Sequence, residues 1–119
     1  MSSRDRKIEA EIQRAVSELV SREVKDPRVG NVTITAVAVT PDRALARVYF
    51  VPFASSHPAE EVRAGLTHAA KFLRGQVGRR LGLRHAPRLE FLFDDSLDRA
   101  ERLTQLIDSA VAGERGSGC

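Results

Sequence analysis

The fold class is decided by residues 32–51, which read VTITAVAVTPDRALARVYFV. Both ends of this stretch are rich in residues that favour strands, and its centre, Pro41-Asp42-Arg43, has the residue types of a tight turn. The sequence therefore predicts a hairpin of two strands, Val32 to Thr40 and Ala44 to Val51. The apolar phase shifts at Ala36, which indicates either a β-bulge or burial of both faces of the first strand.

Amphipathic helices are predicted on both sides of this hairpin. Before it, apolar residues recur at helical spacing, which predicts a helix from Asp5 to Val24. Lys25-Asp26-Pro27-Arg28-Val29-Gly30 ends that helix, because proline restricts the residue before it and glycine permits a turn. After the hairpin, a loop from Pro52 to Pro58 leads into a long or broken helix. The apolar stripe of this middle helix consists of Val62, Leu66, Ala69, Leu73 and Val77.

A third strand and a last helix follow. Leu89, Phe91 and Phe93 alternate with other residues, as is typical of a strand with one apolar face. Asp95-Ser96-Leu97-Asp98 has the short polar and acidic residues of a helix start, and apolar spacing then predicts a helix up to Val111. The sequence therefore predicts a single domain over residues 5–111, with flexible tails at 1–4 and 112–119.

The composition fits one globular domain and excludes several classes of protein. The chain has 119 residues, of which 42% are hydrophobic and 29% are charged, and these values argue against disorder of the whole chain. No apolar run is long enough to span a membrane and no secretion signal is visible, so we expect a cytoplasmic protein. The single cysteine, Cys119, cannot form an internal disulfide, and it lacks a positioned base that would make it a nucleophile.

Positive charge is concentrated in the middle of the chain. The formal net charge is +3, but residues 62–89 carry seven cations and no carboxylate. Residues 1–61 sum to zero, and residues 90–119 sum to −4. A segment of this kind attracts polyanions such as RNA, although a solvated helix face gives the same pattern. The seven cations are Arg63, Lys71, Arg74, Arg79, Arg80, Arg84 and Arg88.

On a helical wheel of the middle helix, cations surround two glycines on the face opposite the apolar stripe. Lys71, Gly75, Gly78 and Arg79 share this face, and Arg74 lies at its flank. Glycines let a phosphate backbone come close to the protein main chain, and neighbouring cations attract it. The residues from Gly75 to Gly78 also match the GxxG loop of KH domains, but so short a pattern often arises by chance.

Two residues of the middle helix fit a straight rod badly. Phe72 falls beside the apolar stripe, and Arg80 falls within it. A bend near Ala70 would re-aim the residues after it and bury Phe72. Otherwise, Phe72 widens the apolar face and Arg80 extends to solvent from the helix end. Tyr49 and the phenylalanines are expected mainly in the core, so the sequence does not predict an aromatic platform that stacks bases.

Six segments of the chain, in this order, resemble the ribosome-binding factor A family. They are Lys25-Asp26-Pro27-Arg28-Val29, Val32-Thr33-Ile34-Thr35 leading into Thr40-Pro41-Asp42, Ala46-Arg47-Val48-Tyr49, Ala69-Ala70-Lys71-Phe72-Leu73-Arg74, Leu83 to Phe91, and Asp94-Asp95-Ser96. The resemblance covers residues 5–111. It implies the α+β class and a single type II KH-like domain of order αββααβα, in which helices pack on a three-stranded sheet. It also implies a kink between the two middle helices at Ala69, Ala70 and Lys71, where the family has glycine in place of the lysine.

The resemblance further implies a bacterial factor that binds the small (30S) ribosomal subunit and its 16S ribosomal RNA. The family assists ribosome biogenesis and rRNA processing at the 5′ end, supports cold adaptation, and acts without catalysis. A GTPase of the assembly pathway can release it. We expect a monomer without a cofactor, whose affinity comes from phosphate contacts. The RNA-binding residues that we expect are Lys71, Arg74, Arg79, Arg80, Arg84 and Arg88.

Other functions stay open at this point. The chain would also suit a KH-type protein that binds single-stranded RNA, or a protein–protein adaptor whose basic face meets an acidic partner. No metal site is predicted, because His57, His68 and His85 lack partners at ligand spacing. An acidic group would suit Mg²⁺ beside RNA, but capping of the last helix explains it more simply. That group consists of Asp94, Asp95 and Asp98.

Overall fold

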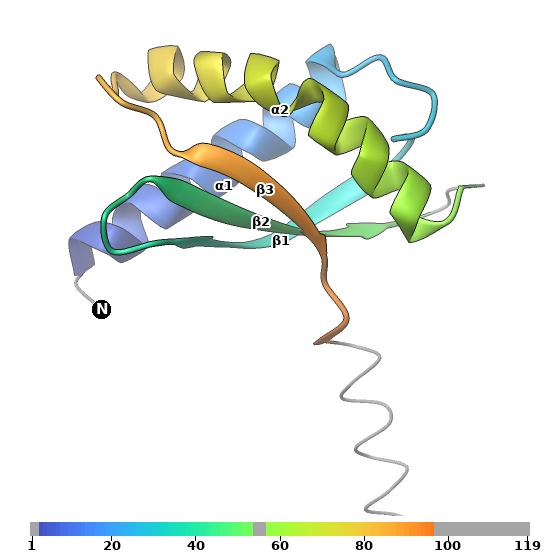
Figure 1. The fold of residues 1–119 in the computed structure, drawn as a ribbon, viewed down its shortest axis with the longest axis horizontal. Helices are drawn as coiled ribbons and strands as arrows, with labels where there is room; N and C mark the ends of the chain where they lie inside the picture. Colours follow the sequence, from blue (N-terminus) through green and yellow to red (C-terminus); the bar gives the residue numbers. More distant parts are fainter. Residues whose placement is uncertain (1–2, 54–56, 97–119) are drawn as a thin grey trace, which may run out of the picture.

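The structure, a computed structural model, describes residues 3–53 and 57–96. Its elements are, in order, α1 (Ser3–Glu23), β1 (Val32–Val39), β2 (Leu45–Pro52), α2 (Ala59–Leu81) and β3 (Arg88–Phe93), as Figure 1 shows. These helices and strands were all predicted, and their bounds differ from the expected ones by only one or two residues. Of the predicted last helix, only Asp95 and the helical Ser96 are described. Of the two predicted tails, only Ser3 and Arg4 are described, and they belong to α1.

β2 is the central strand of a three-stranded sheet with the order β1-β2-β3. β1 and β2 form the predicted antiparallel hairpin, whereas β2 and β3 are parallel, with Leu45 opposite Arg88 and Phe50 opposite Phe93. Parallel neighbours need a long crossover to bring the chain back to the same end of the sheet. α2 is that crossover, and its position is therefore tied to both strands.

The phase shift at Ala36 is a β-bulge. Ile34 pairs with Phe50 and Ala36 pairs with Tyr49, which leaves Thr35 without a partner in the ladder. The extra residue returns the later apolar side chains of β1 to the face that holds Ile34, and Ala36 is exposed. The bulge is therefore confirmed, and burial of both faces of β1 is wrong.

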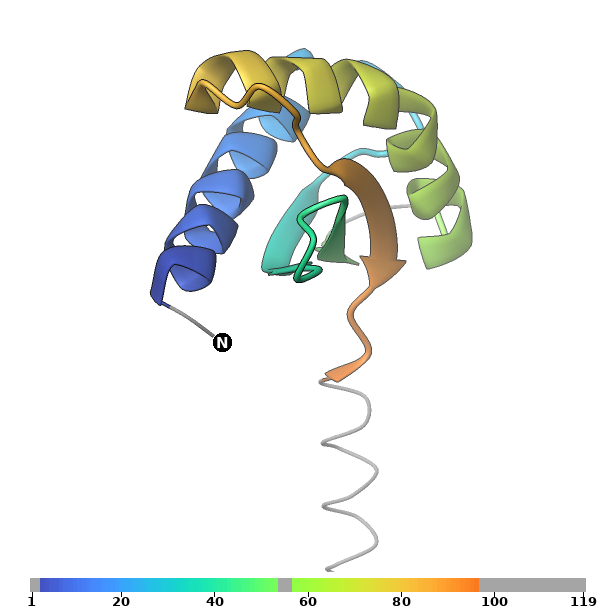
Figure 2. The ribbon, with the colours of Figure 1, turned by 60° about the vertical axis from the view of Figure 1, so that its left-hand side comes forward.

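α1 and α2 pack on one face of the sheet and leave the opposite face uncovered by the described chain (Figures 1 and 2). The core lies between these layers and includes Ile12, Phe50, Leu66, Leu73 and Phe91, each at most 1% exposed. Full burial of one such side chain stabilises the fold by roughly 1.5–3 kcal/mol. The apolar stripes read from the sequence thus meet in one core.

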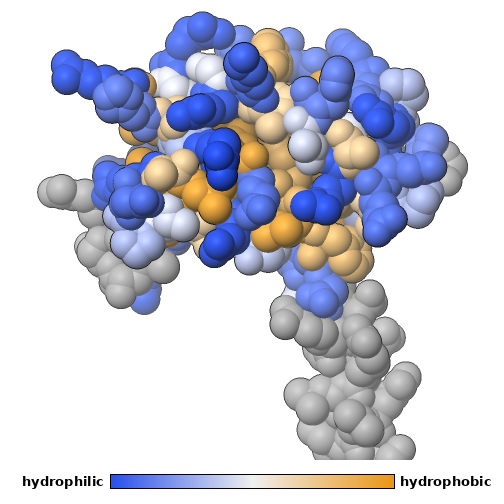
Figure 3. Space-filling model, in the orientation of Figure 1, coloured by the Kyte–Doolittle hydropathy of each residue, from blue (hydrophilic) through white to orange (hydrophobic). Residues whose placement is uncertain are grey.

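Few large apolar side chains are exposed on the described part of the chain. Figure 3 shows hydrophilic side chains around most of this view, with hydrophobic atoms gathered near its centre. Phe53, Phe72 and Phe93 are 52%, 46% and 39% exposed, so the expectation of a core position is wrong for these three phenylalanines.

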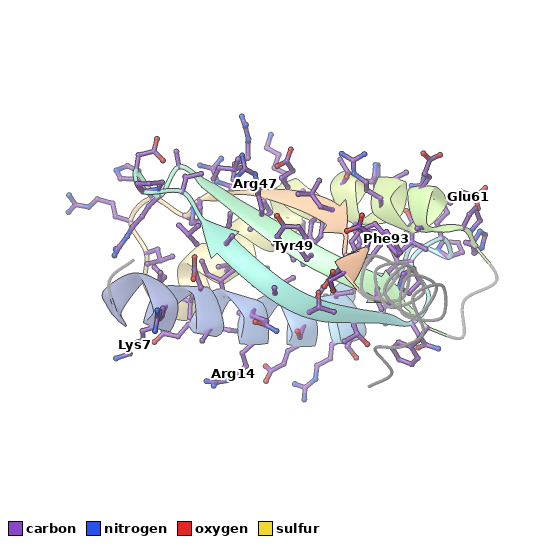
Figure 4. All side chains as sticks on the ribbon, turned by 90° about the horizontal axis from the view of Figure 1, so that it is seen from below. Lys7, Arg14, Arg47, Tyr49, Glu61 and Phe93 are labelled. Carbon is purple, nitrogen blue, oxygen red and sulfur yellow. The ribbon has the colours of Figure 1, made fainter. Side chains whose placement is uncertain are left out.

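Figure 4 looks onto the open sheet face, where Arg47 Nε lies 3.4 Å from Glu90 Oε1 of the neighbouring strand. None of the described helices has the length and apolar character needed to cross a membrane.

α2 is one continuous helix that changes direction near its middle (Figures 1 and 2). The resemblance implied two consecutive helices at this place, and the described helix has a bend instead of an interruption. Its buried residues are Val62, Gly65, Leu66, Leu73 and Val77. Phe72 stays outside this set, so the idea that a bend buries Phe72 is wrong. That the bend lies at Ala69, Ala70 and Lys71 stays a prediction.

The loop after α1 packs closely against the first half of α2. Asp26 accepts hydrogen bonds from Arg28 Nε at 3.0 Å, from Arg28 Nη2 at 2.6 Å and from the Arg28 backbone N–H at 2.9 Å. These bonds to the ionised carboxyl lower the pKa of Asp26 to about 2. A methyl group on Gly65 would lie 2.8 Å from Val29 Cγ2, so only glycine lets this loop and α2 come so close. The Lys25 to Val29 segment therefore has a structural role.

Candidate nucleic-acid interface

The second half of α2 and the loop that follows it line an open hollow of about 460 Å³. We call this surface the basic hollow. Its cationic lining comes from Lys71, Arg74 and Arg79 of the helix and from Arg84 of the loop. The rest of its lining consists of Gly75, Gly78, Leu83, His85 and Ala86. The helical-wheel prediction that cations surround the two glycines on one face is thus confirmed.

A glycine cap shapes the basic hollow. α2 ends at Gly82, which has a left-handed backbone with φ of 65°, and the Leu83 N–H donates to the Gly78 carbonyl at 2.9 Å. The chain therefore turns back, and Arg84 comes to lie beside the helix. Arg74 Nε then donates to the Ala86 carbonyl at 2.9 Å, which ties the returning loop to α2.

Gly78 allows this close packing. A methyl group added there would lie 3.3 Å from the Ala86 side chain, tighter than ordinary contact. Because Val77 beside it is fully buried, the stretch from Gly75 to Gly78 is part of a packed helix and not a loop between helices. The match to the KH clamp loop is therefore wrong as a description of local structure.

The charge of the basic hollow is uncompensated within the described chain. No carboxylate lines it, and among the described residues neither Lys71, Arg74, Arg79 nor Arg84 forms an ion pair. These four side chains are exposed, so their charges face solvent. Arginine offers paired donors that match a phosphate group, and lysine supplies a point charge. The hollow therefore has the chemistry of a phosphate-binding surface.

Two of the six predicted RNA-binding residues lie outside the basic hollow. Arg80 Nη1 lies 2.7 Å from Glu18 Oε2, so this arginine joins α2 to α1. This pairing explains why Arg80 falls within the apolar stripe, since that side of the helix faces α1. Arg88 begins β3, where its backbone N–H donates to the Ala44 carbonyl at 2.9 Å, and its side chain is exposed.

His85 also lines the basic hollow, although it was not among the predicted RNA-binding residues. His85 reaches the hollow because the chain reverses at Gly82. The sequence signal for this reversal was the glycine that follows the last turn of the helix, placed three residues before His85.

A second hollow lies against the first half of α2 and has a different character. It is lined by Arg28, Glu60, Arg63, Ala64, Thr67 and His68. Glu60 brings a carboxylate into it, and Arg63 Nε already donates to the Phe91 carbonyl at 2.8 Å. Its cations are thus partly committed to the protein itself, and the basic hollow is the better candidate for an anionic partner.

Asp94 follows β3 directly and accepts two hydrogen bonds within the described chain. Asp94 Oδ1 accepts a hydrogen bond from the Ser96 N–H at 2.9 Å, and its Oδ2 accepts one from the Thr35 hydroxyl. The last helix that this group was expected to cap lies outside the described residues, so capping stays a prediction. Within residues 3–53 and 57–96 no group of three or more His, Cys, Asp or Glu side chains is placed to hold a metal ion, and Asp98 lies outside that part.

Curated proteins with similar sequences share one name. A ribosome-binding factor A from Thioalkalivibrio sulfidiphilus is 44% identical over 113 residues, which cover 95% of this chain and 88% of that protein. A ribosome-binding factor A from Albidiferax ferrireducens is 49% identical over 106 residues, covering 89% of this chain and 85% of that one.

Solved structures show a similar fold. The crystal structure of ribosome-binding factor A from Thermus thermophilus matches with a TM-score of 0.66 and 31% identity, covering 74% of this chain and 93% of that chain. A homology model of the Thermus thermophilus factor, as fitted into the cryo-EM map of a 30S–RbfA complex, matches with a TM-score of 0.63 and 30% identity, covering 75% of this chain and 93% of that chain.

The family-level comparison covers most of the chain. The family described as ribosome-binding factor A matches residues 4–107, which contain the sheet, α2, all of α1 except Ser3, and the whole basic hollow. Together with relatives above 40% identity, this match is decisive. The chain belongs to the ribosome-binding factor A family.

Proposed function

We propose that this chain binds the small ribosomal subunit during its assembly, and that the basic hollow contacts the 16S ribosomal RNA. Two observations support the proposal. A family relative was fitted into a map of a 30S–RbfA complex, and this chain presents four exposed cations around a hollow that no described carboxylate neutralises. The second observation carries the assignment of the face, because an RNA backbone is the polyanion that such a surface attracts.

The proposed action is binding without catalysis. Phosphate contacts from Lys71, Arg74, Arg79 and Arg84 fix the position of the protein but do not read the base sequence. Specificity then comes from the shape of the folded RNA, which the hollow matches only in certain arrangements. A protein that binds one arrangement more tightly than another shifts the RNA toward it. The factor thereby stabilises one conformation of the maturing subunit.

Arg88 and Arg80 have different roles in the proposed binding. Arg88 is exposed and free to reach RNA beside the hollow, so we retain it as a peripheral contact. Any RNA contact by Arg80 would cost the ion pair of this residue with Glu18, so Arg80 contributes mainly to the packing of α2 on α1.

Reversing two charges together tests whether the basic hollow is the RNA-binding face. The double variant Lys71→Glu and Arg79→Glu should lose co-sedimentation with small subunits, with affinity falling by about 100-fold, because two attractive phosphate contacts become repulsive. Its thermal stability should stay within about 0.5 kcal/mol of wild type, since neither side chain forms an ion pair or a side-chain hydrogen bond within the described chain. This choice leaves the Arg74 bond to Ala86 in place.

A matched control makes the same change in net charge elsewhere. Lys7 and Arg22 are exposed on α1, and the variant Lys7→Glu and Arg22→Glu should bind small subunits nearly as wild type does. Equal losses for both double variants would show that overall charge and not the basic hollow controls binding. Unchanged binding of the hollow variant would refute the proposed RNA face.

A further inference from the structure

Gly75 has no structural reason to be glycine. It lies in the second half of α2, and it is exposed. A methyl group added at its Cα would meet nothing within 4 Å. The other two glycines of the helix differ, because a methyl group on Gly65 would meet Val29 and one on Gly78 would meet Ala86. Since glycine is disfavoured inside helices, Gly75 does not add to the stability of the described chain.

The surroundings of Gly75 suit a ligand. On a helix the side chains three and four residues away are the neighbours of a given position. For Gly75 these neighbours are Lys71, Phe72, Gly78 and Arg79. Bare main chain is thus flanked by two cations of the basic hollow and by an aromatic ring that is 46% exposed.

We propose that an unpaired segment of RNA crosses α2 at Gly75, with its sugar–phosphate backbone against the bare helix and one base stacked on Phe72. This inference rests on the proposed function and specifies the RNA that the basic hollow takes. The absence of a side chain at Gly75 lets the backbone approach the cations on both sides of it. An exposed aromatic ring stacks on a base face, and base faces are accessible only where RNA is unpaired.

Gly75→Ala and Gly75→Leu test the close approach. Both residues favour helix more than glycine does, so the melting temperature should rise by roughly 2–5 °C. The affinity for small subunits should fall, by about tenfold for leucine and less for alanine, because the added side chain holds the RNA backbone away. Stability and binding then change in opposite directions, which a general folding defect cannot produce.

Ser21→Ala is the matched control. Ser21 is exposed on α1, and alanine also raises helix propensity there, but this position is outside the basic hollow. The control should keep wild-type affinity. If the Gly75 variants are stabilised and bind as wild type, or if they are destabilised, the inference is overturned.

Phe72→Leu tests the stacked base. Leucine keeps an apolar side chain of similar bulk but removes the aromatic face, and we expect about tenfold weaker binding of an unstructured RNA oligonucleotide. Binding of an A-form duplex with the same sequence should be weaker in wild type and should not respond to Phe72→Leu. Equal binding of strand and duplex by wild type, or equal sensitivity of both to the substitution, would contradict the inference.

The result also separates this inference from the proposed function. If Lys71→Glu with Arg79→Glu abolishes binding while the Gly75 and Phe72 variants bind normally, the RNA face is right and the unpaired segment at Gly75 is wrong. If the charge-reversal variant binds small subunits as wild type does, the proposed function of the hollow fails, and this inference fails with it.

Discussion

Gly65 and Gly75 lie on the same helix, but their surroundings are opposite. Gly65 is buried, and the loop after α1 comes so close that a methyl group would lie 2.8 Å from Val29. Gly75 faces open space beside four exposed cations. The first half of α2 therefore uses its glycine to build the fold, and the second half leaves main chain accessible to a partner. Stability and binding should thus respond separately to changes in the two halves.

Gly65→Ala should have the largest effect on stability. The added methyl group must displace Val29 or move the whole loop, and overpacking of this kind costs about 2 kcal/mol. For a domain of this size that corresponds to a melting temperature lower by roughly 10 °C. Thermal unfolding followed by circular dichroism measures the change. A stability equal to that of wild type would show that the loop is not packed against α2 as described.

The salt dependence of RNA binding should distinguish the cations in the first half of α2 from those in the second half. With about four phosphates contacted, log affinity for ribosomal RNA should fall against log salt with a slope of about −3. Lys71→Ala should make that slope shallower by about 0.7–0.9. Arg63→Ala, which changes a cation of the first half that is bonded to the Phe91 carbonyl, should leave the slope unchanged. Equal changes in slope for both variants would contradict the proposal that the second half of α2, and not the first, contacts RNA.

Two consecutive arginines provide a smaller contrast. Arg80→Ala removes the contact with Glu18 and should destabilise the fold by about 0.5 kcal/mol, as is usual for exposed ion pairs. Arg79→Ala should leave stability unchanged and weaken RNA binding instead. Urea unfolding and filter binding of both variants measure the two quantities, and the reverse pattern would contradict the assignment of these side chains.

The smallest expected effect is on how the stability of the fold depends on pH in the acid range. The pKa of Asp26 is lowered to about 2 by its hydrogen bonds to Arg28, below the ordinary aspartate value of 3.8. The unfolded chain therefore binds this proton more readily, so the stabilisation is present above about pH 4 and is lost as pH falls toward 2. Asp26→Asn should flatten the loss of stability between about pH 5 and 2. An unchanged acid profile would show that the pair does not persist in solution.

The sequence predicted the elements well because each carries its own local signal. The strand-favouring residues and the turn of residues 32–51, the apolar stripe of α2 and the bulge at Ala36 depend on neighbours that are close along the chain. The bare position at Gly75 was also visible on the helical wheel, since its neighbours lie within four residues. Grouping of Lys71, Arg74 and Arg79 followed from the same local geometry.

Features that depend on distant contacts could not be predicted in this way. The pairing of Arg80 with Glu18 requires the packing of α2 against α1, which helical spacing does not specify. Burial of Gly65 depends on the loop around Val29, far away in the sequence. Phe72 was expected in the core, because hydrophobicity alone does not tell an exposed aromatic residue from a buried one.

A cryo-EM structure of this chain bound to the small ribosomal subunit would show which face of the protein meets the RNA. We predict that the second half of α2 faces the 16S ribosomal RNA, with Lys71, Arg79 and Arg84 within reach of phosphates and Gly75 against the RNA chain. If the basic hollow faces solvent in that complex, and the open face of the sheet or the first half of α2 contacts the RNA instead, the proposed RNA-binding face is wrong.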